Sequence, residues 1–174
     1  LAEAELAAFA HRFGIPVMET VAGKSCLTAD DEAFTGPIGV FAETDGQEIA
    51  WQPDVVLAIG TRLQDFTTES GTVFKNPDVR LVGVNVGRFD ALKRGGLPVI
   101  GDAREALADL AEALGDWRGP AAWQEKARDS FTRQQAGVRA RQAATAGPTP
   151  TYAQVIGAVH EVATADDYIV TSSG

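Results

Sequence analysis

The 174-residue sequence contains a single cysteine and only two histidines, and it has no long apolar run. One cysteine excludes an intrachain disulfide and a cysteine-rich zinc site, and it is consistent with a reducing compartment. A membrane-spanning helix needs roughly 20 apolar residues in succession, and the first residues lack the basic and apolar segments of a signal peptide. We therefore expect a soluble, cytoplasmic protein with no membrane partner.

Acidic residues outnumber basic ones, 24 to 15, which gives a formal net charge of -9 at pH 7. Such a chain repels the phosphate backbone of nucleic acids, and a local excess of arginine over residues 118–141 is offset elsewhere. We therefore expect no nucleic acid partner. The hydrophobic content of 45% suffices for one substantial core and a small piece of a second.

Short apolar runs bounded by turn residues predict strands. They lie at residues 16–20, 54–60 (DVVLAIG), 80–86 (RLVGVNV) and 98–100. The run 54–60 is apolar on both faces, so its sheet must be covered by helices on both sides, and we interpret it as the central strand. The expected fold class is α/β, with a Rossmann-like parallel sheet and helices on both faces. Residues 22–39 are expected to form a loop, with one short helix near Asp31.

Helical spacing of apolar residues predicts three helices in the first 144 residues. The first ends at Gly14, which supplies a left-handed cap. A second begins after Asp102, which with Glu105 forms a variant of the N-terminal capping pattern, and it ends at Gly115. A third, more charged helix is expected from Pro120 to about Ala144.

The segment Gly147-Pro148-Thr149-Pro150 predicts a domain boundary, because proline removes a backbone donor and favours extended conformations. After it, Thr151 and Gln154 form a capping box that opens a helix. Residues 168–171 are expected to form a buried strand. This last piece is typical of the opening of another α/β domain.

The turn Gly60-Thr61-Arg62 follows a predicted parallel strand, at the sheet edge where open α/β folds bind ligands. Gly60 allows a ligand to approach the backbone, Thr61 can donate a hydrogen bond, and Arg62 can bind a phosphate with two parallel bonds. The alternative is that Gly60 only makes the turn and that Arg62 pairs with Asp65.

Asn85 and the turn Gly101-Asp102 are expected at the same edge. Backbone N–H groups at the helix start can hold an anion, but Asp102 places a negative charge there and more simply serves as the cap. No G-x-G-x-x-G follows a strand, so the fingerprint of nicotinamide nucleotides is missing.

The remaining chemically reactive side chains stand alone. His11 and His160 lie on predicted helices without the Ser, Cys or acidic motif of a triad or metal site. Cys26 follows Lys24 and Ser25, and we interpret it as a partly buried spectator rather than a thiol activated by a cation.

Five segments, in this order over residues 1 to 115, resemble the central domain of thiamine-diphosphate-dependent enzymes. They are 15–24 (IPVMETVAGK), 36–40 (GPIGV), 54–66 (DVVLAIGTRLQDF), 85–93 (NVGRFDALK) and 98–104 (PVIGDAR). Thr67-Thr68 and the segment 85–93 are most similar to the ring-opening hydrolases of myo-inositol catabolism. Those enzymes cleave a carbon-carbon bond in a cyclic 1,2-diketone.

The resemblance implies three α/β domains in the complete enzyme. Residues 1–146 would be the central domain, lacking its first strand and followed by a linker helix, and residues 147–174 the start of the C-terminal diphosphate-binding domain. Its tail would bring Ser172, Ser173 and Gly174 near the diphosphate. Thiamine diphosphate and Mg2+ would bind outside this chain, which we expect to be an internal, inactive fragment without catalytic or metal-binding residues.

The resemblance also implies partners. They are the remaining domains of the same enzyme and, because active sites in this family lie between subunits, further copies in a homo-oligomer. Some members bind FAD or an adenine nucleotide such as ADP on the central domain, with a Gly-x-Arg turn that matches Gly60, Thr61 and Arg62. Ala42, where a loop glycine is common, and Gly46-Gln47, where an Ala-Asn pair is common, depart from the flavin pattern. A nucleotide-binding module and a transferase of the acetolactate synthase type remain as alternatives.

Overall fold

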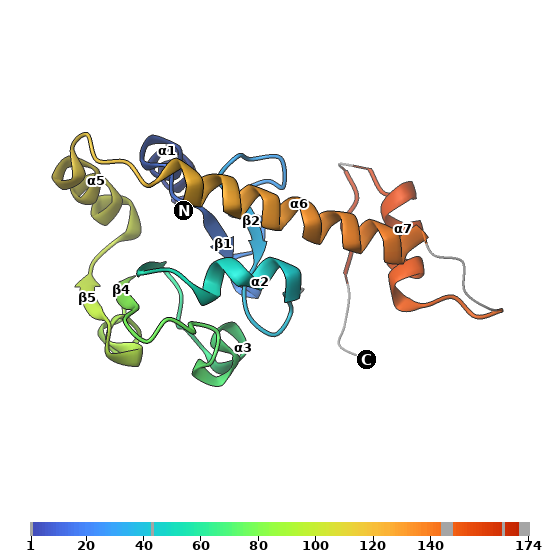
Figure 1. The fold of residues 1–174 in the computed structure, drawn as a ribbon, viewed down its shortest axis with the longest axis horizontal. Helices are drawn as coiled ribbons and strands as arrows, with labels where there is room; N and C mark the ends of the chain where they lie inside the picture. Colours follow the sequence, from blue (N-terminus) through green and yellow to red (C-terminus); the bar gives the residue numbers. More distant parts are fainter. Residues whose placement is uncertain (1, 43, 144–147, 165, 171–174) are drawn as a thin grey trace. The chain divides into compact units, whose positions relative to one another are not determined.

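The computed structural model describes residues 2–42, 44–143, 148–164 and 166–170 (Figure 1). The chain divides into two compact units, residues 1–133 and 134–174, and each is described by itself. The expected domain boundary begins at Gly147, which lies outside the described residues, so this boundary stays a prediction. None of the helices within the described ranges is long and apolar enough to cross a membrane.

Strands and helices alternate along the first unit. In chain order they are α1 (Glu3–Phe13), β1 (Val17–Glu19), η1 (Val21–Gly23), β2 (Phe34–Pro37), α2 (Thr44–Trp51), β3 (Val55–Ile59), α3 (Asp65–Thr68), η2 (Glu69–Gly71), β4 (Arg80–Asn85), α4 (Arg88–Ala91), η3 (Lys93–Gly95), β5 (Leu97–Ile100) and α5 (Ala103–Leu114). Helix α6 (Ala121–Ala143) begins in the first unit and ends in the second, which also contains α7 (Tyr152–Val162).

All the described strands pair in parallel, which confirms the expected α/β class. They form a two-stranded sheet of β1 and β2 and a three-stranded sheet in the order β3-β4-β5. The expectation that residues 54–60 form the central strand is wrong for this sheet, because β4 lies in the middle and Val55 of β3 is 53% exposed. An apolar strand sequence indicates that other elements cover the faces of the strand, but it does not indicate which strands pair with it.

Helix α1 packs against both sheets. Phe9 and Phe13 form one core cluster with Leu107 of α5, and Leu57 and Ile59 of β3 pack against this cluster. Ala10 of the same helix packs in a second cluster with Phe34 of β2, and Val17 of β1 packs against that cluster. Phe13 is fully buried, and burial of a phenylalanine side chain stabilises a fold by about 1.5–3 kcal/mol.

The segment between β1 and α2 differs from its prediction. Phe34–Pro37 forms strand β2 instead of a loop, and the short helical turn lies at Val21–Gly23 instead of near Asp31. Gly36 and Pro37 weaken the strand signal in the sequence, but pairing with β1 and burial of Phe34 outweigh that local preference.

Four predicted helix ends are confirmed. Gly14 ends α1 with φ 63° and ψ 44°, in the left-handed region. The Asp102 carboxylate accepts a hydrogen bond from the Arg104 N–H and so caps α5, while Gly115 ends that helix. Thr151 and Gln154 form the capping box of α7. Local capping chemistry was therefore read correctly from the sequence.

The predicted strand at residues 168–171 does not form over its described part. Tyr168 and Val170 are 97% and 91% exposed, without strand structure. A strand needs a neighbour for its backbone N–H and C=O groups, and the described residues provide none here. Residues 171–174, including the predicted diphosphate-facing Ser172, Ser173 and Gly174, lie outside the described residues.

Candidate functional site

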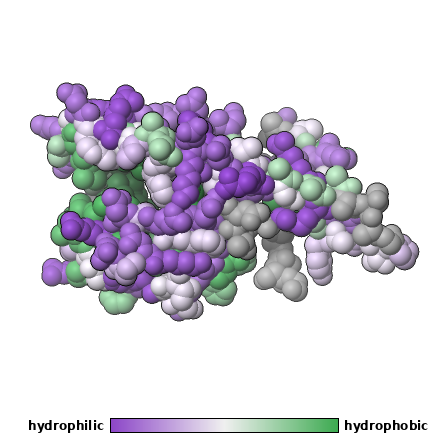
Figure 2. Space-filling model, viewed as in Figure 1, coloured by the Kyte–Doolittle hydropathy of each residue, from purple (hydrophilic) through white to green (hydrophobic). Residues whose placement is uncertain are grey.

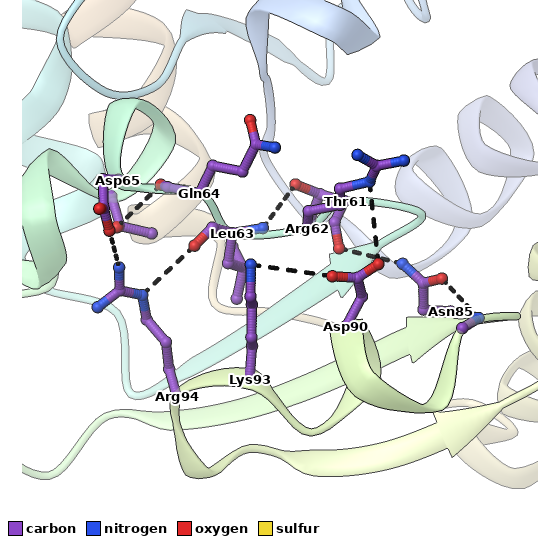
Figure 3. A network of polar contacts seen from close by, with 11 residues as sticks. Thr61, Arg62, Leu63, Gln64, Asp65, Asn85, Asp90, Lys93 and Arg94 are labelled. Atoms are coloured by element: carbon purple, nitrogen blue, oxygen red, sulfur yellow. Dashed lines mark hydrogen bonds and ion pairs between the residues drawn. The ribbon is translucent and has the colours of Figure 1, made fainter.

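The carboxyl ends of β3, β4 and β5 bring the predicted site residues to one edge. The Gly60 N–H donates to the carbonyl of Val84 at 2.8 Å, and the Gly101 N–H donates to that of Asn85 at 3.2 Å. The side-chain amide of Asn85 donates in turn to the carbonyl of Thr61 at 3.1 Å (Figure 3). The prediction that these residues share an edge is therefore confirmed, whereas their binding role stays a prediction.

The backbone at this edge is open at two glycines. Gly60 adopts φ 63°, a conformation that favours glycine, and a Cβ built there would meet no atom within 4 Å. A Cβ built at Gly101 would likewise meet no atom within 4 Å. The space that a ligand needs to approach the backbone is present at both positions.

Arg62 is only loosely held. Its Nε lies 3.9 Å from a carboxylate oxygen of Asp90, and its side chain is 69% exposed, a geometry that contributes little to stability. The alternative that Arg62 pairs with Asp65 is wrong, because Asp65 instead binds Arg94 at 3.1 Å. Arg94 also donates through Nε to the carbonyl of Leu63 at 3.4 Å.

Sequence reasoning missed the contribution of α4 and η3 to this edge. Asp90 of α4 lies near both Arg62, in the loop after β3, and Lys93 of η3, each at 3.9 Å (Figure 3). An open cavity of about 260 Å³ lies beside them, lined by Leu63, Gln64, Asp65, Lys93 and Arg94. The one available signal was the Asp-x-x-Lys spacing at 90–93, which is common on helix surfaces.

The carboxylates of this edge already have partners. Asp65 binds Arg94, Asp90 lies between two cations, and Asp102 caps α5. Over the described ranges, no group of three or more His, Cys, Asp or Glu side chains is placed to hold a metal ion.

The isolated reactive side chains have structural surroundings. Burial raises the pKa of the Cys26 thiol, and the Glu19 carboxylate, 3.7 Å from its Sγ, raises it further. A raised pKa is the opposite of what an activated thiol requires, so the spectator interpretation fits. His11 binds Asp31 at 2.8 Å, and His160 is exposed on α7.

The fold and this edge define the class of protein: a parallel α/β domain with a loosely held arginine and open glycines at the carboxyl ends of its strands. Comparison with known families identifies the family within this class. Residues 1–110 match the family described as "Thiamine pyrophosphate enzyme, central domain"; thiamine pyrophosphate is another name for thiamine diphosphate. The match covers more than half of the chain, and the chain belongs to this family.

Its relatives include enzymes named 3D-(3,5/4)-trihydroxycyclohexane-1,2-dione hydrolase. The protein of Clostridium botulinum strain Alaska E43 is 43% identical over 109 residues, and one of Bacillus cereus strain ZK is 44% identical over 110 residues. That of Clostridium perfringens strain ATCC 13124 is 41% identical over 106 residues. The matched region is 61–63% of this chain but 17% of each relative, so the chain spans a small part of their length.

Proposed function

We propose that this chain is the central part of a thiamine-diphosphate-dependent hydrolase that opens the ring of trihydroxycyclohexane-1,2-dione, as in myo-inositol catabolism. The chain itself is structural and inactive. The names of the relatives support the reaction, and they do not favour a transferase of the acetolactate synthase type. The observation that supports the structural role is the polar network at the carboxyl edge, in which the site residues bind one another.

This network ties two loops together from opposite sides. Arg94 of η3 donates to the Leu63 carbonyl in the loop after β3 and to the Asp65 carboxylate at the start of α3. Asn85 at the end of β4 binds Thr61 of the same loop, and its side-chain oxygen accepts from the Gly87 N–H at 2.9 Å. Each such bond contributes about 1 kcal/mol, which suits a rigid support for neighbouring domains.

Thiamine diphosphate and Mg2+ belong, in this proposal, to the parts of the enzyme outside this chain. Those parts are its partners, within a cytoplasmic homo-oligomer. The test is an assay of the full-length enzyme on trihydroxycyclohexane-1,2-dione, with pyruvate as the competing substrate. We expect ring opening that requires thiamine diphosphate, no acetolactate, and no turnover by residues 1–174 alone. Acetolactate formation would refute the reaction, and turnover by the short chain would refute its structural role.

Nucleotide binding is the second candidate, supported by the open backbone at Gly60 and Gly101 and by the exposed side chain of Arg62. Calorimetric titration of the chain with FAD and with ADP tests it. If the chain binds FAD or ADP and Arg62→Ala weakens that binding at least tenfold, about 1.4 kcal/mol, the domain is a nucleotide-binding module and not only a structural support. Arg80→Ala is the control, because it removes the same charge at the other end of β4. No binding by the wild type would leave the structural role.

A further inference from the structure

The open cavity at the carboxyl edge lies between the residues that follow β3 and those of η3. Leu63, Gln64, Asp65, Lys93 and Arg94 line it, whereas the open glycines of the edge do not. Pockets for drug-sized ligands have volumes of about 300–1,000 Å³, and this cavity has a volume of about 260 Å³. Its size therefore suits a small metabolite better than a dinucleotide such as FAD.

Arg94 forms a fixed wall of this cavity. Its guanidinium donates to the carbonyl of Leu63 at 3.4 Å and to the carboxylate of Asp65 at 3.1 Å. A Cβ on Gly71 would lie 2.6 Å from a terminal nitrogen of Arg94, so the guanidinium also packs against the backbone at Gly71. These two bonds use only part of the donor capacity of an arginine. The wall is therefore in place before a ligand binds, and it retains donors for one.

The backbone of this wall is unusual at two residues. Leu63 has φ 43° and Arg94 has φ 58°, both in the left-handed region that favours glycine. The hydrogen bond from Arg94 Nε to the Leu63 carbonyl joins the two residues. Backbone conformations of this kind cluster at ligand-binding sites, where the surrounding structure maintains them. The wall of the cavity has this property on both sides of one hydrogen bond.

Lys93 is the cation that is available to a ligand. Its Nζ lies 3.9 Å from a carboxylate oxygen of Asp90, which is beyond hydrogen-bond distance, and 5.6 Å from the ring centroid of Phe89. The side chain of Lys93 is 30% exposed, and Figure 3 shows it extending from η3 toward the loop after β3. A ligand carboxylate can therefore reach Lys93 without breaking a close ion pair.

The local charge at this edge is positive, although the chain carries a net charge of -9. The ion pairs of the edge join three cations with two carboxylates, which leaves one positive charge; the groups are Arg62, Lys93, Arg94, Asp65 and Asp90. A singly charged anion neutralises that excess. A phosphate group, with a charge of about -1.5 to -2 at pH 7, would leave negative charge beside two carboxylates. The charge balance therefore favours a monocarboxylate over a phosphate.

The remaining polar groups of the cavity suit hydroxyl groups. The side-chain amide of Gln64 has both donors and an acceptor, and the carboxylate of Asp65 accepts. The proposed ring opening makes a molecule with both features. Hydrolysis of the bond between two adjacent carbonyl carbons gives the hydroxyl of water to one carbon, which becomes a carboxylic acid, and hydrogen to the other, which becomes an aldehyde. A neutral ring thereby becomes an open-chain hydroxy acid with one negative charge at pH 7.

We infer that this cavity binds a small, singly charged hydroxy acid, and that the acid released by the ring opening is its ligand. Lys93 binds the carboxylate, Arg94 forms the fixed wall, and Gln64 and Asp65 bind hydroxyl groups. The class of ligand follows from the size and charge of the cavity. Only the identity of the acid rests on the proposed function.

Calorimetric titration of the full-length enzyme with sodium D-glucuronate, a hydroxy acid that also carries an aldehyde, tests the site. We expect the wild type to bind it and Lys93→Gln to weaken binding about tenfold or more, because a charge-assisted contact is lost. Lys93→Arg keeps the charge and should retain most of the affinity. Arg118→Gln, which removes a positive charge at another exposed position, is the control and should bind as the wild type does.

The outcome that overturns the inference is equally direct. Absence of binding by the wild type, or equal binding by the wild type and Lys93→Gln, would show that the cavity does not hold the acid. Gln64→Ala, at an exposed residue, is the second variant should Lys93→Gln fail to fold, and it should weaken binding several-fold.

Further probes define the class of ligand. D-Glucose, which has no carboxylate, should not bind, and inorganic phosphate and ADP should bind about tenfold or more weakly than glucuronate. The acid isolated from the ring-opening reaction should bind at least as tightly as glucuronate. Tighter binding of phosphate or ADP through Lys93 would overturn the choice of a monocarboxylate. Failure of the isolated acid to bind would overturn its assignment as the ligand.

Ring opening by the same enzyme is assayed in parallel, so that the two proposals can be separated. Binding of glucuronate through Lys93 by an enzyme that does not open the ring would contradict the proposed function alone. Ring opening without binding that depends on Lys93 would contradict this inference alone.

Discussion

Gly83, in the middle of β4, allows the backbone of α4 to pack directly against the sheet. A Cβ at this position would lie 3.1 Å from the carbonyl carbon of Ala91 and closer still to its oxygen. Gly83 is not among the residues with positive φ, so the requirement is one of space and not of conformation. The residue therefore sets how closely α4, and with it Asp90, approaches the carboxyl edge.

We expect Gly83→Ala to lower the free energy of unfolding by about 1–3 kcal/mol, because backbone atoms of α4 must move. Urea denaturation of the chain measures the change. Gly137→Ala is the control, because the nearest atom to its Cβ would be a flexible arginine at 3.6 Å and alanine favours a helix by about 1 kcal/mol. Equal stability of Gly83→Ala and the wild type would contradict the packing argument.

Asp31 links α1 to the segment before β2. Burial tends to raise the pKa of this carboxyl, but the hydrogen bonds from His11 and the Ala33 N–H outweigh burial and lower it. A lowered pKa in the folded state means that the carboxylate stabilises the fold above its unfolded pKa. That contribution is lost as the pH falls through the folded pKa.

We therefore expect Asp31→Asn to cost about 0.5–1 kcal/mol at pH 7, and this difference from wild type to shrink as the pH falls below about 4. Urea midpoints at pH 7, 5 and 3.5 test it. The exposed Asp109→Asn serves as the matched carboxylate control and should show no such trend. A difference that stays constant down to pH 3.5 would show that the carboxylate charge is not involved.

Among the elements, α5 depends on a single side-chain cap. Asp102 is in extended conformation, and its carboxylate accepts from the Arg104 N–H at 2.8 Å. The cap satisfies a donor that has no partner within the helix. It also occupies the helix start at which a ligand anion would otherwise bind.

Asp102→Ala should lower the free energy of unfolding by about 1 kcal/mol, whereas Asp102→Asn should retain most of the stability, because both Asp and Asn are good N-caps. Thermal unfolding of both variants measures this. Asp109→Ala, at an exposed position of the same helix, should cost nothing. If Asp102→Ala leaves the free energy of unfolding unchanged and allows an anion to bind, the main role of Asp102 is to exclude anions from the start of α5 and not to cap the helix.

The elements that the sequence predicted correctly are those with local signals. Gly14 ends α1 because glycine tolerates a left-handed conformation, and the apolar runs of β3, β4 and β5 need no knowledge of their neighbours. Strand β2 was missed because its only strong support is its pairing with β1. Over its described part, residues 168–170, the strand expected at residues 168–171 does not form, because an apolar run without a neighbouring strand has no partners for its backbone groups.

For the whole molecule, apolar side chains remain uncovered around the carboxyl edge. Phe41 and Phe66 stack on each other at 6.0 Å between ring centroids, yet they are 63% and 66% exposed, and Phe89 is 77% exposed. Hydrophobic residues also reach the surface elsewhere, as the green areas of Figure 2 show. Exposed apolar patches of this kind mark surfaces that contact another protein part.

We expect residues 1–174 to self-associate when separated from the rest of the enzyme. Sedimentation velocity across a range of concentrations should show dimers or larger species. Phe89→Glu should weaken the association about tenfold or more, because it places a charge in the contact. Tyr152→Glu, exposed in the second unit, is the comparison variant. A strictly monomeric chain at all concentrations would show that these side chains do not drive association.

Sequence alone determined the family, the α/β class, most strands and the helix caps, because periodicity, capping and motif order are carried by residues close together in the chain. Only the tertiary structure decided which charges meet at the carboxyl edge. Arg94 reaches Asp65 from 29 positions away, and Arg62 lies near Asp90 instead of its expected partner. It also decided that, among the described residues, β3 pairs with β4 alone, since strand order depends on contacts between segments that are distant in sequence.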